Sequence, residues 1–180
     1  FQFDCLNIIK GGWNWDGKIY GVICGVAAYF IFRRQFADNN FFTLKQDKEG
    51  LRSALKVAIG LLSVYVLVGL LGEKEFDAET LLFQISMPGL DEEVMCRGVM
   101  LGLMCSTLRE GGKPSLNPAI IINGIWFGLV HSLAFQSGEV VFSVASFIVT
   151  GLVGYALAYI ALRSRSILIP MLTHNLCNFC

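Results

Sequence analysis

The sequence is poor in charged residues. Asp, Glu, Lys and Arg make up 16% of the 180 residues, whereas 54% are hydrophobic. Soluble domains contain about 25% charged residues, so this chain has too few of them to cover a surface in water. The composition also excludes a disordered chain, because such chains are rich in charge and poor in aromatic residues. We therefore expect a single membrane-embedded domain that covers residues 1–180.

An excess of either charge is also missing. Fourteen basic residues balance 14 acidic residues, and the formal net charge is zero. Proteins that bind nucleic acids carry a basic patch or stripe, and this sequence has none. We therefore expect no nucleic acid among its partners. The partner that the composition predicts is membrane lipid.

The cysteines indicate neither a disulfide framework nor a zinc ribbon. Most of the six lie in apolar stretches, where a free thiol behaves as a small hydrophobic group. Cys177 and Cys180 form a C-x-x-C motif, but a zinc ribbon needs a second pair, which the sequence lacks. Candidate catalytic or metal-binding residues must therefore be sought among other residue types.

Long apolar runs take the place of the missing charge. A helix needs about 20 mainly apolar residues to cross a bilayer. Six elements fit this pattern, at residues 19–32, 54–71, 80–108, 119–135, 140–162 and from 167 onward. The third contains Met87-Pro88-Gly89, where we expect a break and a new helix start, since proline suits the first helical turn. The expected fold class is all-α, a polytopic transmembrane helix bundle.

The ends of the sequence and its loop charges give two further expectations. The chain begins with Phe1 rather than Met, and the last apolar run reaches the final residue, so we expect a fragment with a truncated C-terminus. The loops at 33–52, 109–118 and 163–166 contain basic residues, whereas the loop at 72–79 is mainly acidic. By the positive-inside rule, the basic loops lie in the cytoplasm.

Three acidic residues stand where an apolar helix is expected. A charged side chain at the bilayer centre costs at least about 2.5–3.5 kcal/mol, so such residues are functional by default. Glu93 and Arg97 are four residues apart and can pair on one helix face. Glu92 then has no cation on its own helix, which suits a general base or acid. Alternatively, Asp91, Glu92 and Glu93 merely cap a helix N-terminus.

Both histidines of the chain, His131 and His174, lie within apolar runs. One such histidine is commonly a core residue, but two together with an acid pair favour a site. Asn178 shares a helix face with His174. Two chemistries remain open: Glu92 and a histidine can activate water, or Glu92, His131 and His174 can bind a divalent metal such as zinc. The short H-E-x-x-H metal motif is absent.

Three motifs in this order resemble those of the CPBP intramembrane protease family, which includes the CAAX prenyl endopeptidases and the bacterial Abi or bacteriocin-processing proteins. The motifs are Glu92-Glu93-x-x-x-Arg97, Phe127-x-x-x-His131 and His174-x-x-x-Asn178. The resemblance implies a catalytic core at about 80–180. The helices in 1–79 would add only topology. Cys96 departs from the family pattern, in which an aromatic residue precedes the arginine.

The resemblance also implies roles for these residues. Glu92 would activate water with the assistance of His131, and His174 and Asn178 would stabilise the oxyanion. The remaining pair would orient the site, Glu93 acting through Arg97. The active site would lie in an intramembrane cavity that opens to the cytoplasm and to lipid. The motifs do not decide between a glutamate protease and a metalloprotease.

We therefore expect an intramembrane endopeptidase that cuts a peptide bond near the membrane surface. Its substrate would be a CAAX-type lipidated protein or a bacteriocin-type peptide, and the small size favours a multi-pass protein of a bacterial cell membrane. One alternative is a catalytically silent immunity or binding protein of the same fold. Another is an ion or proton pathway through Glu92, His131 and His174. A nucleophilic Cys177 is a weaker alternative.

Overall fold

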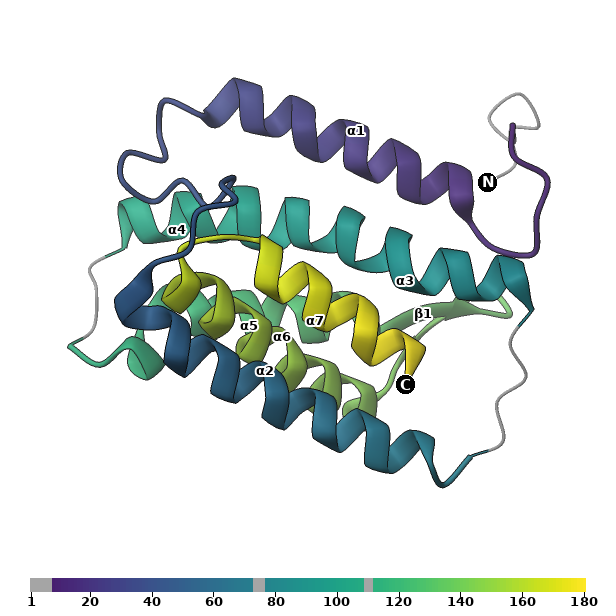
Figure 1. Cartoon of the computed structure of the whole chain (residues 1–180). Coiled ribbons are helices and arrows are strands. Elements are labelled where there is room, and N and C mark those ends of the chain that lie inside the picture. The colour runs from purple at the N-terminus through teal and green to yellow at the C-terminus, as the bar shows by residue number, and fades with distance from the viewer. Residues whose placement is uncertain (1–7, 73–76, 109–111) are drawn as a thin grey trace.

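The structure is a computed structural model that describes residues 8–72, 77–108 and 112–180 (Figure 1). Parts of the loops at 72–79 and 109–118, and Cys5, lie outside the described residues. The fold is mainly helical. Its elements in chain order are α1 (Trp15–Phe32), α2 (Lys48–Gly69), α3 (Ala78–Glu93), the π-helix η2 (Val94–Met100), α4 (Leu101–Thr107), the short 3-10 helix η3 (Pro114–Leu116), α5 (Pro118–Ser132), β1 (Leu133–Gln136), β2 (Glu139–Phe142), α6 (Val144–Ser164) and α7 (Leu168–Phe179).

Helices α3, η2 and α4 follow one another as a single long rod through the molecule (Figure 1). Helix α1 packs on one side of this rod, and α7 packs against α3. Helix α6 packs against both α5 and α2. The rod therefore lies between α1 and the remaining helices, and side chains of α3 can meet residues from both sides.

Helix α3 does not break at Met87-Pro88-Gly89, contrary to the sequence-based prediction, and Pro88 lies inside it. Proline removes one backbone donor and disturbs a helix interior by about 3 kcal/mol. A side chain from α7 compensates for this. The backbone N–H of Gly89 donates to Asn175 Oδ1 at 2.7 Å, and Asn175 Nδ2 donates to the Ser86 carbonyl at 3.3 Å. The helix continues because Asn175, from α7, makes hydrogen bonds to the backbone groups on either side of Pro88.

The segment between α5 and α6 is a β-hairpin rather than the expected helix ends. Strands β1 and β2 pair antiparallel, with Gln136 opposite Glu139. The turn residues Ser137 and Gly138 have φ angles of 53° and 89°, and a two-residue hairpin turn of this kind needs positive φ at both positions. The all-α class is therefore corrected to a mainly helical fold with one hairpin. A short apolar run fits a strand as well as a helix end, which explains the error.

Close backbone contact joins α5 to α6. A Cβ atom added at Gly124 would lie 3.0 Å from the carbonyl oxygen of Gly151, and one added at Gly128 would lie 2.7 Å from that of Phe147. Side chains at these positions would push the helices apart. Small residues spaced four apart are a common means of close helix packing in membranes.

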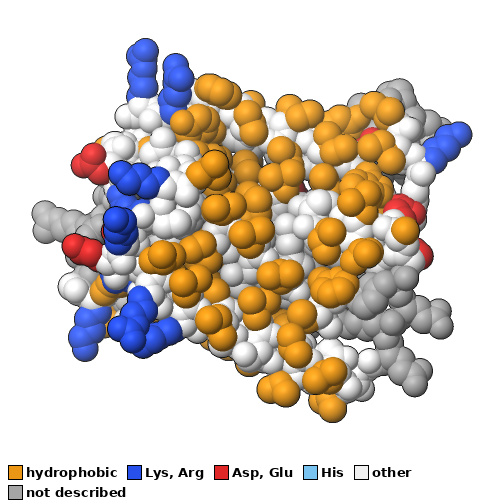
Figure 2. All heavy atoms as spheres, in the orientation of Figure 1, with side chains coloured by type: hydrophobic (Ala, Val, Ile, Leu, Met, Phe, Trp, Pro, Cys, Tyr) orange, Lys and Arg blue, Asp and Glu red, His pale blue; other side chains and the backbone are white. Residues whose placement is uncertain are grey.

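Two helices in the described part of the chain, α2 and α6, are long and apolar enough to cross a membrane. Helix α5 is apolar but shorter. Large apolar side chains cover the middle of the molecular face in Figure 2, and Lys and Arg side chains gather at its left end. This is the end at which α1 finishes and α2 begins (Figure 1). The six-span bundle therefore remains a prediction, since only these two described helices have the length and composition of a membrane span.

Candidate active site

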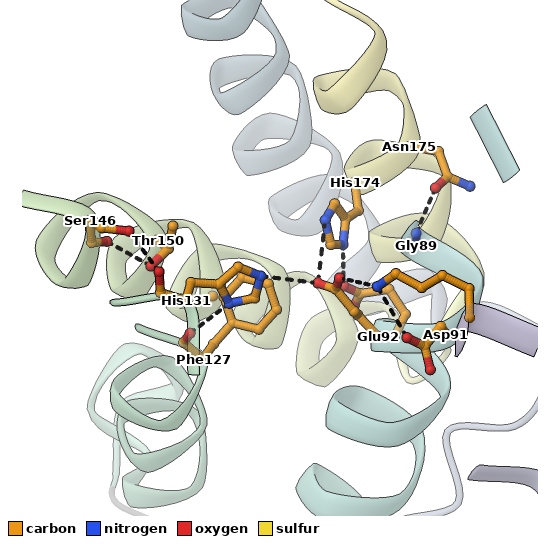
Figure 3. A network of polar contacts seen from close by, with 12 residues as sticks. Gly89, Asp91, Glu92, Phe127, His131, Ser146, Thr150, His174 and Asn175 are labelled. Carbon is orange, nitrogen blue, oxygen red and sulfur yellow. Dashed lines mark hydrogen bonds and ion pairs between the residues drawn. The ribbon is translucent and has the colours of Figure 1, made fainter. Parts of the chain in front are cut away.

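Glu92 lies at the centre of a polar cluster (Figure 3). It is next to the last residue of α3, and its side chain is 20% exposed. Oε1 accepts a hydrogen bond from Lys18 Nζ at 2.6 Å. Oε2 faces His131 Nε2 at 3.5 Å and His174 Nε2 at 3.8 Å. The structure therefore brings together the first acid and the two histidines that the sequence singled out.

His131 is oriented by its own helix. Its Nδ1 lies 2.8 Å from the carbonyl oxygen of Phe127, and a carbonyl only accepts hydrogen bonds. The contact therefore requires a proton on Nδ1 and leaves Nε2 directed at Glu92. The Phe127 ring packs against the imidazole, with 4.2 Å between ring centroids. The motif Phe127-x-x-x-His131 thus fixes both the position and the tautomer of the histidine.

His174 is oriented in the same way by a different group. Its Nδ1 lies 2.8 Å from Glu93 Oε1, so Nδ1 carries a proton and Nε2 faces Glu92 (Figure 3). Glu92 Oε2 is buried and makes no hydrogen bond with the residues that the structure describes. Two nitrogen atoms from separate helices thus converge on one oxygen that lacks a partner in this part of the chain.

Glu93 and Arg97 form the ion pair that their spacing predicted. Arg97 Nη1 donates to Glu93 Oε1 at 2.9 Å, and both side chains are fully buried. Arg97 Nη2 donates to the Gly154 carbonyl at 3.0 Å, and the guanidinium lies 4.4 Å from the centre of the Phe127 ring. Because Glu93 Oε1 also meets His174, this pair connects α3 and η2 with α6 and α7.

Asn178 lies beside the two histidines on a small cavity of about 90 Å³. The structure gives it no hydrogen bond with the described residues. Cys177, on the same wall, is buried, and no disulfide joins the five cysteines that the structure describes. The cavity is lined by Leu61, Tyr65, Phe127, His131, Thr150, Val153, Leu157, His174, Cys177 and Asn178. Apart from the histidines and Asn178, these walls are mainly apolar.

Two residues of the cluster were missed from the sequence. Lys18 comes from α1 and is 74 residues away from Glu92 in the chain, so an amino-terminal helix that was expected to add only topology contributes a contact to the cluster. Glu92 lacks a cation only on its own helix. Asn178 was selected from the sequence and Asn175 was missed, although Asn175 accepts a hydrogen bond from α3. For Lys18, the only signal in the sequence was the presence of a lysine in the first turn of an apolar helix.

Glu92, His131 and His174 are residue types that can bind a divalent metal. In the part of the chain that the structure describes, no group of three or more His, Cys, Asp or Glu side chains could hold a metal ion. The ammonium of Lys18, 2.6 Å from Glu92, already supplies a positive charge to this carboxylate. A metal ion bound to Glu92 would lie beside this ammonium, and like charges repel each other.

The histidine of α5, His131, lies far from the basic end of the protein. His131 is in the last turn of α5, and its carbonyl accepts a hydrogen bond from Ser146 in the first turn of α6. Arg163 is in the last turn of α6, about 26 Å farther along at 1.5 Å per residue. Glu92, by contrast, lies near the middle of the rod, 14 residues after its first residue, Ala78, and 15 before its last, Thr107.

The chain matches the family model of the type II CAAX prenyl endopeptidases, Rce1-like, over residues 76–180. This is more than half of the chain, and the chain therefore belongs to this family. No curated protein and no solved structure matches it. The match confirms the resemblance carried by the three motifs. Membership supports a membrane-embedded CAAX-type protease whose substrate is a membrane-associated peptide or protein. Lys18 lies outside the matched region.

Proposed function

We propose that the protein is an intramembrane endopeptidase in which Glu92 activates the water that cleaves a peptide bond. The observation that carries this proposal is the convergence of His131 Nε2 and His174 Nε2 on Glu92 Oε2. A carboxylate beside two oriented imidazoles can take a proton from water and hold the water in place. The family match supports peptide hydrolysis as the reaction.

In the proposed reaction, the oxygen of water attacks the scissile carbonyl carbon while Glu92 Oε2 takes a water proton. The carbonyl electrons move to oxygen and form an oxyanion. When this oxyanion collapses, the C–N bond breaks, and Glu92 passes its proton to the leaving nitrogen. Glu92 returns to the carboxylate form. The products are a carboxylic acid and an amine, and no redox partner is needed.

The neighbouring residues have distinct parts in this proposal. His131 Nε2 accepts a hydrogen bond from the attacking water and orients it. His174, when protonated on both nitrogens, donates to the oxyanion from Nε2, while its Nδ1 stays bound to Glu93 Oε1. Asn178, on the wall of the same cavity, supplies an amide donor. The pair of Glu93 and Arg97 keeps His174 in place.

We further propose a CAAX-type substrate, the peptide tail behind a lipidated cysteine. The family match supports this choice over a bacteriocin-type peptide. The mainly apolar cavity of about 90 Å³ beside the two histidines can take an aliphatic side chain next to the scissile bond. Helices α2 and α6, which line this cavity, also carry exposed apolar side chains that would face lipid.

The test is cleavage of a quenched-fluorescent farnesylated CAAX peptide by the purified protein in lipid vesicles. We expect the parent to cleave, and we expect Glu92→Gln to lower kcat by about 1,000-fold, within the range for losing a general base. A chelator should leave the rate unchanged. Parental kcat in a folded Glu92→Gln variant would refute Glu92 as the base. Loss of activity on chelation would refute the metal-free reaction.

We propose a multi-pass topology in a bacterial membrane, with the basic end in the cytoplasm. The site, with Glu92 near the middle of the α3–η2–α4 rod, then opens toward the cytoplasm, where the tail of a CAAX-type substrate lies. In a cysteine-free background, single cysteines replace Ser137 at the hairpin turn or Lys45 before α2. A membrane-impermeant maleimide should label the former in intact cells and the latter only after permeabilisation. The reverse pattern would overturn this orientation.

A further inference from the structure

We infer that Lys18 is a positioning residue of the active site: it holds one carboxylate oxygen of Glu92 and thereby directs the other oxygen at the two imidazoles. The inference rests on the proposed function. Lys18 belongs to α1, outside residues 76–180 that match the family. The catalytic unit would therefore include a helix that the family motifs do not contain.

The contact made by Lys18 is the shortest polar contact of Glu92. Nζ lies 2.6 Å from Glu92 Oε1, whereas the two histidine nitrogens lie 3.5 and 3.8 Å from Oε2. Hydrogen bonds between charged groups are shorter and about twice as strong as neutral ones, and a separation of 3.8 Å is too long for a hydrogen bond. Lys18 therefore determines the direction of the carboxylate.

This direction has a chemical consequence. A glutamate side chain has three rotatable bonds, so a free Glu92 would occupy several rotamers. With Oε1 held by Lys18, only Oε2 is left to receive the water proton, and Oε2 is the oxygen that faces His131 and His174. A misplacement of about 1 Å at a reacting group can cost about 100-fold in rate. Holding the carboxylate is thus a contribution to kcat.

The packing of α1 is suited to bring Lys18 to this point. A Cβ atom added at Gly21 would lie 2.0 Å from Asp91 Oδ1, and one added at Gly25 would lie 2.7 Å from a methyl group of Val94. Lys18 is three residues before Gly21 and therefore points to the same side of the helix. The two glycines thus allow α1 to lie close enough to α3 and η2 for the lysine to reach Glu92.

Asp91 offers a competing explanation for Lys18. Its Oδ2 lies 3.1 Å from Lys18 Nζ, and Lys18 would be purely structural if its only purpose were to pair with this residue. The two explanations differ in the effect of Asp91→Asn. If Lys18 acts through Glu92, Asp91→Asn keeps kcat within about 3-fold, a loss typical of a partly exposed ion pair. If Lys18 serves Asp91, Asp91→Asn and Lys18→Met reduce activity equally.

The experiment measures kcat and KM of Lys18→Met, Lys18→Arg and Asp91→Asn with the farnesylated CAAX peptide in lipid vesicles. Lys56→Met, at an exposed position on α2, is the matched control. We expect Lys18→Met to lower kcat by about 100-fold with an unchanged KM. Lys18→Arg, which keeps the cation, should recover most of that loss. Lys18→Met should add no further loss to the residual rate of Glu92→Gln, because the two residues act as one unit.

Each outcome decides the inference. Parental kcat in a folded Lys18→Met protein, or equal losses in Lys18→Met and Asp91→Asn, would overturn it while cleavage by the parent leaves the proposed function standing. A folded parent that does not cleave would instead overturn the proposed function, and the inference with it. If Lys18→Met does not fold, Lys18→Gln replaces it, since its amide keeps a polar group at the end of the side chain.

Discussion

Glu92 and Glu93 are neighbours in the chain, yet they lie in opposite environments. Glu93 is fully buried, and its Oε1 meets both Arg97 and His174. Glu92 is 20% exposed, is held by Lys18 through Oε1, and has an Oε2 without a hydrogen bond to the described residues. Oε2 of Glu93 is likewise buried without a hydrogen bond to the described residues, but only Oε2 of Glu92 faces the two histidine Nε2 atoms. We therefore assign Glu93 to the fold and Glu92 to the proposed reaction. The comparison shows how one acid pair can serve both stability and reaction.

The sharpest way to break this comparison is to remove the partner of the buried acid. Arg97→Met leaves Glu93 charged in the interior with only His174 beside it, and breaking a buried ion pair costs about 3–5 kcal/mol. We expect a large fall in thermal unfolding temperature in detergent. Arg52→Met, at an exposed position on α2, is the control and should unfold like the parent. Equal stability of the Arg97 and Arg52 variants would show that the buried pair does not hold the fold.

A smaller effect is expected from the residue that joins α7 to α3 behind Glu93. Asn175→Ala leaves the buried N–H of Gly89 without its acceptor, and an unsatisfied buried donor costs about 1–3 kcal/mol. Denaturation followed by tryptophan fluorescence measures the loss. Asn178→Ala is the matched control on the same helix and should be less destabilising. The compensation assigned to Asn175 would be wrong if the two variants unfolded together.

Glu92 should behave in the opposite way from Glu93 in the same unfolding measurement. Glu92→Gln removes a partly exposed ion pair, and Lys18 keeps Asp91 as a partner, so the stability should change by less than about 1 kcal/mol. Activity, by contrast, should be lost. A Glu92→Gln protein that unfolds as readily as Arg97→Met would remove the distinction between the two acids.

The smallest effect concerns an acid at the far end of α3, outside the cluster. Asp77 caps the helix by accepting a hydrogen bond from the Thr80 backbone N–H at 2.7 Å, and this bond holds the pKa of Asp77 below its ordinary value. A lowered folded-state pKa contributes stability above the unfolded-state pKa, and this contribution is lost as the pH falls through the folded-state pKa. The stability difference between the parent and Asp77→Asn should therefore shrink in acid. A difference independent of pH would contradict this.

The spacing of residues along the helix predicted the buried pair of Glu93 and Arg97 better than the contacts of the partly exposed Glu92. Glu93 and Arg97 could be paired from their separation of four residues, because helix geometry places such residues on one face. The meeting of Glu92 with His131 and His174 followed from a resemblance of motifs, and the structure brings these three together. The roles of these residues, and of Asn178, stay predictions.

Contacts that depend on how separate helices pack could not be predicted from the sequence. Lys18 meets Glu92 across 74 residues, and Asn175 meets Gly89 across 86. No periodicity or local motif encodes such pairs. The continuous helix through Pro88 was missed for the same reason, because local propensity argues for a break and a tertiary contact overrides it. The hairpin was missed because short apolar runs are ambiguous.

The π-helix η2 affects which changes in the length of the α3–η2–α4 rod the protein can tolerate. Residues 94–100 form a wider turn, which accommodates one residue more than an α-helix would. Because the wider turn absorbs the extra residue, deleting one residue there would return the rod to regular α-helical winding with α4 still facing its partners. A deletion within α3 or α4 would instead turn the two ends of the rod by about 100° relative to each other, and the carboxylates and the core face of α4 could then no longer both meet their partners. A change of one residue in length should therefore be tolerated better in this turn than elsewhere in the rod.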